Sequence, residues 1–359
     1  MTLTQLKETI QKFAPLVVIF LLVVLIFYFS FRLLVLYANS GKQVPVNTKE
    51  QIKTDPTFGS ITAPQIPDGK PSDEYTYILD TLDGTTNFET ATSAATVYFV
   101  PKETPTFGFL STIYNMASQF DIDTEQFPHV LDGEIATFDD GVRKLAIDIT
   151  TYNFAFNRKI DVAEGLFDTS FLPRQDYIER EAQDLLRVLR YPSDLAQGTR
   201  SVSYFFYNVE QNQIEPVDTN EGANMVEVDF FRPDLGAYPF VTSSYFNSPH
   251  YVLYAINRST LIPIRAQVAY YDYSPEKVGV YPLRTPDQAW EDLSKGKGLV
   301  VSNFNPNKEI RIQKIFLGYY EPDDYQEYIQ PVYVFLGEDK FVAYVPAVSE
   351  NFVAKPKSQ

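Results

Sequence analysis

The two histidines are the first side chains to consider for chemistry, because the chain contains no cysteine. His129 follows Pro128 in a predicted loop, and His250 follows Pro249 just before a predicted strand. Zinc sites draw most of their ligands from cysteine and histidine, so a zinc site here would need mainly carboxylates. We therefore expect His129 and His250 to be polar surface residues, and we expect no metal site and no bound cofactor.

Three acidic residues alternate in a way that resembles the start of a calcium-binding loop: Asp121, Asp123 and Glu125. Such a loop also needs a central glycine and a final bidentate glutamate. Both are missing here, so we expect a solvated turn that follows a helix.

Nucleophilic catalysis has one formal candidate, the Ser-x-x-Lys spacing of Ser274 and Lys277. That chemistry places the pair at the start of a helix. Here Pro275 lies between the two residues, in a predicted turn between strands. We therefore expect no catalytic residue in this segment.

The segment Ile78–Phe88 resembles the metal-binding signature of inositol monophosphatases. The resemblance implies that Asp80 and Asp83 hold Mg²⁺ and that Thr85 orients the attacking water. However, Thr81 stands where that family has a proline, and the upstream Gly-Glu-Glu is absent. Two aspartates alone hold Mg²⁺ poorly, so we expect an Asp-Gly turn.

The most specific segment of the chain is the apolar run from residue 14 to residue 38, which only Ser30 and Arg32 interrupt before Tyr37. At about 1.5 Å per residue this helix is roughly 37 Å long, enough to cross the roughly 30 Å hydrocarbon core of a bilayer. A secretory signal peptide is the alternative. Its apolar core is shorter, about 7–15 residues, and Tyr37-Ala38-Asn39 is a poor cleavage site. We therefore predict a retained single-pass transmembrane helix.

The positive-inside rule does not by itself decide the orientation, because positive charges lie on both sides of this helix. Lys7 and Lys12 precede it, whereas Arg32, Lys42 and Lys49 lie near or beyond its end. The short N-terminal tail needs no translocation, and a single N-terminal anchor commonly exports the chain that follows. We expect residues 1–13 in the cytoplasm and the C-terminal domain outside it, at the cell membrane.

Net charge and composition narrow the class of function. The chain has 359 residues and a formal charge of −16, which argues against nucleic-acid binding because phosphate backbones are repelled. Its 25 tyrosines and 28 phenylalanines indicate a body rich in β-sheet.

The remaining chain divides by its patterns into a linker and three units. Residues 39–93 contain many prolines and threonines without a sustained period, which predicts an extended stalk or linker with order beginning near Ala94. Alternating helical and strand periods then predict an α+β domain at 94–160, a second α+β unit at 161–250 and a C-terminal α+β unit at 251–349, before a tail at 350–359. The predicted fold class is α+β, with repeated small antiparallel sheets that each carry a helix on one face.

The C-terminal unit has the clearest local signals. Thr285 and Gln288 form a capping-box pattern for a helix from Pro286 to Lys295, which Gly296 ends. We expect Ala289, Trp290 and Leu293 to face inward. Residues 330–336 and 341–346 predict a hairpin whose strands are apolar at both parities, which indicates a sheet covered on both faces.

This arrangement of capped helix, long strand and final hairpin resembles the C-terminal part of the YycH and YycI extracytoplasmic regulators and the related PepSY-like domains. The resemblance covers about residues 285–349 and carries no catalytic motif. It implies a sensor, an inhibitor or an accessory protein that binds another protein at the cell envelope.

Three functions therefore stay open. The first is a membrane-anchored regulatory or sensor accessory that acts by protein contact with an envelope protein. The second is a structural or ligand-binding envelope module whose aromatic residues contact glycan or peptide. The third is a metal-dependent hydrolase. An exposed sheet edge favours the first, and acids gathered in a pocket favour the third.

Overall fold

The computed structural model describes residues 23–25, 28–30, 32, 52–67, 69–161, 165–190 and 192–354. The chain divides into two compact units, Met1–Ile52 and Lys53–Gln359. In the first unit, the described residues 23–25, 28–30 and 32 are helical. Among all described residues, no helix is long and apolar enough to cross a bilayer. The tail 1–13 and most of the predicted membrane helix 14–38 lie outside the described residues.

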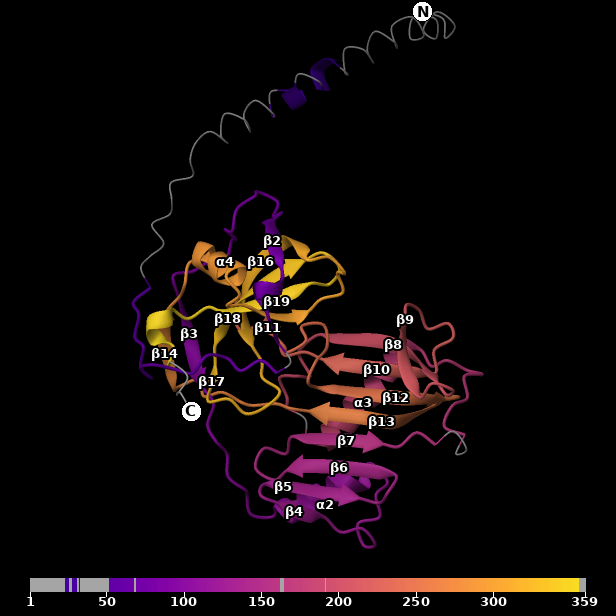
Figure 1. The fold of residues 1–359 in the computed structure, drawn as a ribbon. Coiled ribbons are helices and arrows are strands. Elements are labelled where there is room, and N and C mark those ends of the chain that lie inside the picture. The colour runs from indigo at the N-terminus through magenta and orange to yellow at the C-terminus, as the bar shows by residue number, and fades with distance from the viewer. Residues whose placement is uncertain are drawn as a thin grey trace, which may run out of the picture. The chain divides into compact units, whose positions relative to one another are not determined.

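The second unit is a sheet-rich α+β structure with three sheets. The largest has nine strands in the order β4-β5-β6-β7-β13-β12-β10-β8-β9, which can be followed across Figure 1. Every neighbouring pair in it is antiparallel. Its strands are β4 (Val130–Asp132), β5 (Ile135–Asp139), β6 (Arg143–Asp148), β7 (Phe154–Arg158), β8 (Arg200–Asn208), β9 (Gln213–Val217), β10 (Met225–Phe230), β12 (Tyr251–Asn257) and β13 (Thr260–Val268).

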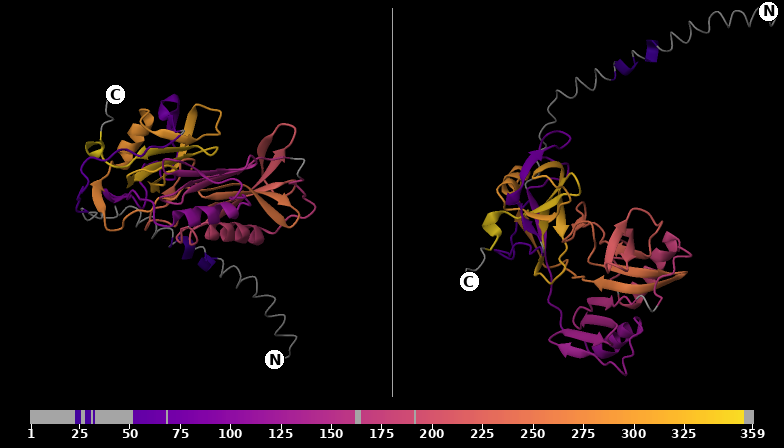
Figure 2. Two further views of the ribbon diagram at one scale, coloured as in Figure 1. Left: turned by 90° about the horizontal axis from the view of Figure 1, so that it is seen from below. Right: turned by 45° about the vertical axis from the view of Figure 1, so that its right-hand side comes forward.

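Two helices cover one face of this sheet, as Figure 2 shows from below. They are α2 (Phe109–Ser118) and α3 (Gln175–Val188). Apolar residues at helical spacing, such as Ile113 in α2 and Ile178 and Leu186 in α3, pack on alternate strand residues and are fully buried. The side chains of β10 and β12 alternate between the two faces of the sheet. Every second residue enters this core, and the residues between them face away from the helices.

The second sheet has seven strands, in the order β1-β15-β19-β18-β16-β11, with β2 also paired to β16. Its strands are β1 (Lys70–Pro71), β2 (Thr76–Leu79), β11 (Phe240–Val241), β15 (Leu299–Ser302), β16 (Glu309–Tyr320), β18 (Pro331–Gly337) and β19 (Val342–Pro346). The pairs β2·β16 and β11·β16 are parallel, so this sheet is mixed. A third sheet, β14-β3-β17, consists of β3 (Ala94–Phe99), β14 (Val278–Pro282) and β17 (Tyr328–Ile329).

The C-terminal helix and hairpin form as their sequence predicts. Helix α4 (Pro286–Ser294) has Thr285 as its N-cap in a complete capping box, and Ala289 and Leu293 are fully buried. Trp290 is only partly buried. The β18–β19 turn places Asp339 and Lys340 at positive φ, the geometry of a tight hairpin turn.

Strand β18 is covered on both of its faces, in agreement with its apolar residues at both parities. Tyr333 and Phe335 enter the cluster that contains the α4 residues, whereas Val332 and Val334 enter a separate cluster with Tyr320.

The range 39–93, expected to be an extended stalk, differs from that expectation in its described part. Residues 70–79 supply β1 and β2 to the seven-stranded sheet. Ser72 is fully buried and its hydroxyl donates to the carbonyl of Leu293 at 2.8 Å. Strands this short show no period in the sequence, and Pro71 lies on an edge strand, where proline is tolerated.

The predicted units also share sheets instead of each forming its own. Strands from 94–160, 161–250 and 251–349 all enter the nine-stranded sheet, and the last range also supplies most of the seven-stranded sheet. Helix α2 has Gly108 at its N-cap, in a left-handed conformation.

Candidate functional site

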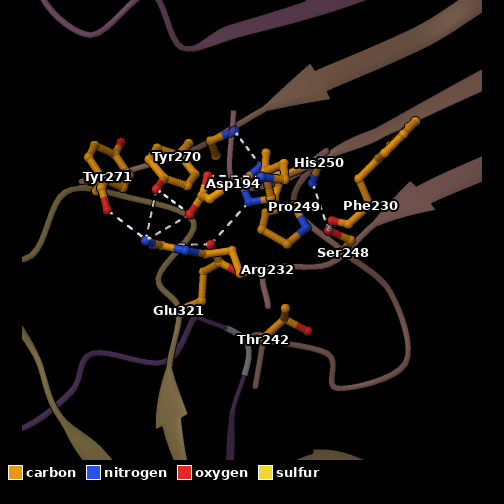
Figure 3. A network of polar contacts seen from close by, with 12 residues as sticks. Asp194, Phe230, Arg232, Thr242, Ser248, Pro249, His250, Tyr270, Tyr271 and Glu321 are labelled. Atoms are coloured by element: carbon orange, nitrogen blue, oxygen red, sulfur yellow. Dashed lines mark hydrogen bonds and ion pairs between the residues drawn. The ribbon is translucent and has the colours of Figure 1, made fainter. Parts of the chain in front are cut away.

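A buried polar network lies where strands of the two large sheets end (Figure 3). Arg232 follows β10, His250 immediately precedes β12, and Tyr270 follows β13, all from the nine-stranded sheet. Glu321 follows β16 of the seven-stranded sheet.

The surface position predicted for His250 is wrong. Its side chain is 0% exposed, and its Nε2 lies 3.1 Å from Oε1 of Glu321. The backbone N–H of Ala269 donates to Nδ1 at 3.3 Å. A nitrogen that accepts a hydrogen bond carries no proton, so His250 is the neutral Nε2–H tautomer and donates to Glu321.

Arg232 supplies the positive charge of the network and is almost completely buried. Its guanidinium donates to the hydroxyl of Tyr270 at 2.9 Å and to the carbonyl of Tyr271 at 3.2 Å. It lies 3.6 Å from Glu321 and 3.7 Å from Asp194, and it stacks over the ring of Tyr270 at 4.2 Å. A buried guanidinium needs such partners, because an unpaired buried charge is very costly.

Tyr270 connects Arg232 to Asp194. Its hydroxyl accepts from Arg232 and donates to the Asp194 carboxylate at 2.7 Å. Burial raises the pKa of Tyr270 well above its ordinary value, and the Arg232 charge opposes this only in part. The hydroxyl therefore stays protonated and remains a donor. We interpret the network as a joint between strand ends, and Asp194, whose side chain is 34% exposed, lies at its outer end beyond Tyr270.

A cavity of about 340 Å³ adjoins the joint and shares Tyr270 and Tyr271 with it. Tyr325 also lines it, edge-to-face with Tyr271 at 6.0 Å, and donates its hydroxyl to the carbonyl of Val100. The charged lining residues are Lys102, Glu103, Glu134, Asp148 and Asp272.

The acids of this cavity influence one another. Burial, together with the charges of Asp272 and Asp148, raises the pKa of Glu103. Asp148 already accepts hydrogen bonds from the backbone and hydroxyl of Thr150. An aromatic wall with an excess of carboxylates is suited to a cationic or amide-rich group rather than to an anion. Among the described residues, no cluster of three or more His, Asp or Glu side chains could hold a metal ion.

The aspartates of the phosphatase-like segment form a surface turn. Asp83 accepts from the backbone N–H of Thr85 at 3.0 Å and from its hydroxyl at 2.8 Å, which lowers the Asp83 pKa. Gly84 lies at positive φ, as a tight turn requires. Asp80 is exposed on the strand side of the same turn.

The other sequence candidates also lie apart from one another. His129 is partly buried, with Nδ1 at 3.2 Å from the Tyr114 hydroxyl. Asp123 accepts from the backbone of Glu125 and Gln126 in the turn after α2. Ser274 accepts from the backbone N–H of Lys277, in a turn and not at a helix start.

The two edges of the nine-stranded sheet differ in how they are blocked against pairing with a further strand. Edge strand β9 carries Glu215 and Pro216, the kinds of residue that prevent further strand pairing. Edge strand β4 is exposed throughout, with Val130 at 70% and Leu131 at 48% exposure. Within the described part of the chain, β4 pairs only with β5.

Comparisons with known proteins give only remote similarity. No family model matches the chain, and no curated protein matches its sequence. Among solved structures, an uncharacterized protein from Eubacterium rectale is 12% identical, with a TM-score of 0.34, over 72% of this chain and 84% of its own. The C-terminal domain of YpeB from Bacillus megaterium is 13% identical, with a TM-score of 0.31, over 70% of this chain and 96% of its own. Similarity at this level does not carry an argument about function.

Proposed function

We propose that this protein is a membrane-anchored regulatory or sensor accessory that acts outside the cytoplasm by contact with another envelope protein. In this proposal the apolar run 14–38 anchors the chain as a single-pass helix. The sheet-rich unit after residue 52 presents the contact surface.

The observation that carries this proposal is the exposure of two apolar residues on the short edge strand β4, Val130 and Leu131. Edge strands with exposed apolar residues pair readily with a strand from another chain, so proteins usually block them. The chain blocks β9 with Glu215 and Pro216, yet leaves Val130 and Leu131 of β4 exposed. Because β9 is blocked and β4 is exposed, we interpret β4 as the strand that contacts the partner protein.

Charge indicates what kind of segment would pair there. Asp132, the last residue of β4, and Glu134, in the turn after it, are exposed and acidic, as is Asp123 nearby in the chain. The partner strand should therefore combine apolar residues with lysine or arginine, because complementary charges orient an interface.

The more specific proposal, a regulator of the YycH and YycI type with a PepSY-like C-terminal part, rests on the sequence pattern of residues 285–349. Its elements lie together as that pattern requires, since α4 packs on a sheet that contains the β18–β19 hairpin.

Site-specific photo-crosslinking in intact cells tests the contact. A photoreactive residue at Leu131 should give one discrete protein adduct, and the same residue at Gln213 on the blocked edge β9 should not. Val130→Lys should abolish the Leu131 adduct, because it adds a positive charge that repels a basic partner strand. Loss of fold is not expected, since Val130 is exposed. Absence of the adduct, or its persistence in Val130→Lys, would contradict the proposal.

A ligand-binding envelope module is the second candidate, and the cavity beside Tyr270 favours it. Three tyrosines and four carboxylates around about 340 Å³ suit a basic peptide side chain. Binding of lysine-rich peptides, measured by titration, would support this candidate over the first if Asp272→Asn weakens that binding.

A further inference from the structure

The face of the nine-stranded sheet that helices α2 and α3 leave open carries a hollow of about 440 Å³. Ala146 of β6, Ala155 of β7 and Gln267 of β13 line it and lie opposite one another in the strand register. Phe154 and Phe156, on either side of Ala155, enter the core beneath the helices, so Ala155 points to the open face. Two alanines side by side leave the space that larger side chains would fill.

The hollow lies in line with the exposed edge strand β4. Val130 of β4 is opposite Thr137 of β5, and Thr137 is opposite Ala146. One row of side chains therefore crosses five strands on a single face, from Val130 through the two alanines to Gln267. Four strand spacings of about 4.8 Å make this row roughly 19 Å long, which matches about six residues of an extended chain.

One end of the hollow is acidic. Asp148, the last residue of β6, lines it together with Asp323 and Asp324, which follow β16. Asp148 accepts from the backbone and hydroxyl of Thr150, and Asp323 accepts from the Ser243 hydroxyl at 2.5 Å. These donors are neutral, so they leave both negative charges in place. Burial and the charge of Asp324 raise the pKa of Asp323, so a cation at this end would stabilise its charged form.

Two cations on the same face of the sheet lie beside other acids. Lys144 of β6 is directly opposite Asp139 of β5, and Arg265 of β13 interacts with Glu227. Neither Lys144 nor Arg265 lines the hollow. Its described lining residues include the three aspartates and no lysine or arginine, so the hollow itself is negatively charged.

We propose that this hollow docks a segment of the envelope partner in which aliphatic residues alternate with lysine or arginine. The inference rests on the proposed function, because the same partner would contact β4. Aliphatic side chains fit over the two alanines and beside Ile135, which also lines the hollow. A lysine or arginine reaches the aspartate end, where a charge-assisted hydrogen bond orients the segment.

Titration of the full chain in neutral detergent tests the proposal, with a fluorescent peptide that alternates valine and lysine, at neutral pH and constant ionic strength. Asp323→Asn with Asp324→Asn should weaken binding about fivefold or more, and Asn at 323 keeps an acceptor for Ser243. The matched control is Asp218→Asn with Asp272→Asn, which removes two exposed carboxylates outside the hollow and should leave binding unchanged. Equal weakening by both double variants would show attraction to the net charge or to the tyrosine-lined cavity, and would overturn the proposal.

Shape is tested separately from charge. A peptide that alternates glycine and lysine has the same charge but no aliphatic side chains, so it should bind more weakly than the valine–lysine peptide. Ala155→Lys fills the hollow and should weaken the valine–lysine peptide about fivefold or more. Because Ala155 is exposed, this variant should keep its fold. Equal binding of the two peptides, or unchanged binding by Ala155→Lys, would contradict docking over the alanines.

Photo-crosslinking in intact cells separates failure of this inference from failure of the proposed function. A photoreactive residue at Ala155 should capture the same protein as one at Leu131, and Asp323→Asn with Asp324→Asn should weaken the Ala155 adduct more than the Leu131 adduct. An adduct at Leu131 without one at Ala155 would overturn the docking site and leave the β4 contact in place. Lack of both adducts would overturn both.

Discussion

Nε2 of His250 lies 3.1 Å from Oε1 of Glu321, although the two residues are 71 positions apart in the chain. His250 precedes a strand of the nine-stranded sheet, and Glu321 follows a strand of the seven-stranded sheet. This contact, with the Arg232–Glu321 ion pair beside it, joins the ends of β12 and β16, two strands that lie in different sheets.

Glu321→Ala should lower the free energy of unfolding by about 3–5 kcal/mol, because it leaves Arg232 buried with one less counter-charge and His250 without an acceptor. Chemical denaturation measures the loss. Asp324→Ala removes an exposed carboxylate three residues away and should change stability by less than about 0.5 kcal/mol. Similar small effects from both variants would show that the joint is not important for stability.

His250 should show the nitrogen chemical shifts of the Nε2–H tautomer in long-range ¹H–¹⁵N NMR spectra at neutral pH. The reason is that the Ala269 N–H occupies Nδ1. His129, whose Nδ1 contacts a tyrosine hydroxyl instead, provides the internal comparison. Spectra in which His250 is protonated on Nδ1 would disprove the assigned hydrogen-bond direction.

Glu227→Gln should stabilise the protein at pH 8 and have little effect at pH 4. Burial, and secondly the charge of Asp229, raises the pKa of Glu227 from 4.5 to about 7. A raised pKa means that the folded state favours the protonated acid: this contribution is complete below pH 4.5 and is lost as the pH rises through 7.

The expected gain at pH 8 is about 3 kcal/mol, a little below the full size of this shift at about 1.4 kcal/mol per unit, because Glu227 is not fully buried. Denaturation of both proteins at the two pH values measures it. Glu215→Gln on exposed β9 is the control and should show no such difference. A gain that is equal at pH 4 and pH 8 would be inconsistent with a buried, titrating Glu227.

Trp290→Ala should cost about 2–4 kcal/mol, somewhat less than for a fully buried tryptophan, because Trp290 is only partly buried. Its ring contacts Tyr77 and Phe335, with centroids 6.4 and 6.2 Å away. Trp290→Phe keeps part of this packing and should lose less. As the only tryptophan, Trp290 should also give an emission that shifts to the red on unfolding; an emission already red-shifted in the native protein would contradict this packing.

Orientation can be tested because the chain has no cysteine. Gln211→Cys, in the exposed β8–β9 turn, should react with a membrane-impermeant thiol reagent in intact cells. Thr4→Cys in the N-terminal tail should react only after lysis. The reverse pattern would place the sheet-rich unit in the cytoplasm.

Local signals allowed parts of the fold to be predicted from the sequence. The capping box at Thr285 and the two-parity strand at Pro331–Gly337 both depend on residues within a few positions of one another, and both form as expected. The pairing of β2 with β16 and the burial of His250 by Glu321 depend on residues far apart in the chain. No spacing rule in a single sequence expresses such contacts, so the stalk prediction for 70–79 and the surface prediction for His250 were wrong.

The position of β16 has a consequence for how the chain folds. Its first half pairs with β2, from residues 76–79, and its second half with β11, from residues 240–241. The seven-stranded sheet therefore cannot close until the last hundred residues are available, and the earliest strands must wait unpaired during synthesis. Non-local pairings of this kind slow folding and leave strand edges open to aggregation. We therefore expect the early strands to need protection from aggregation until β16 has been synthesised.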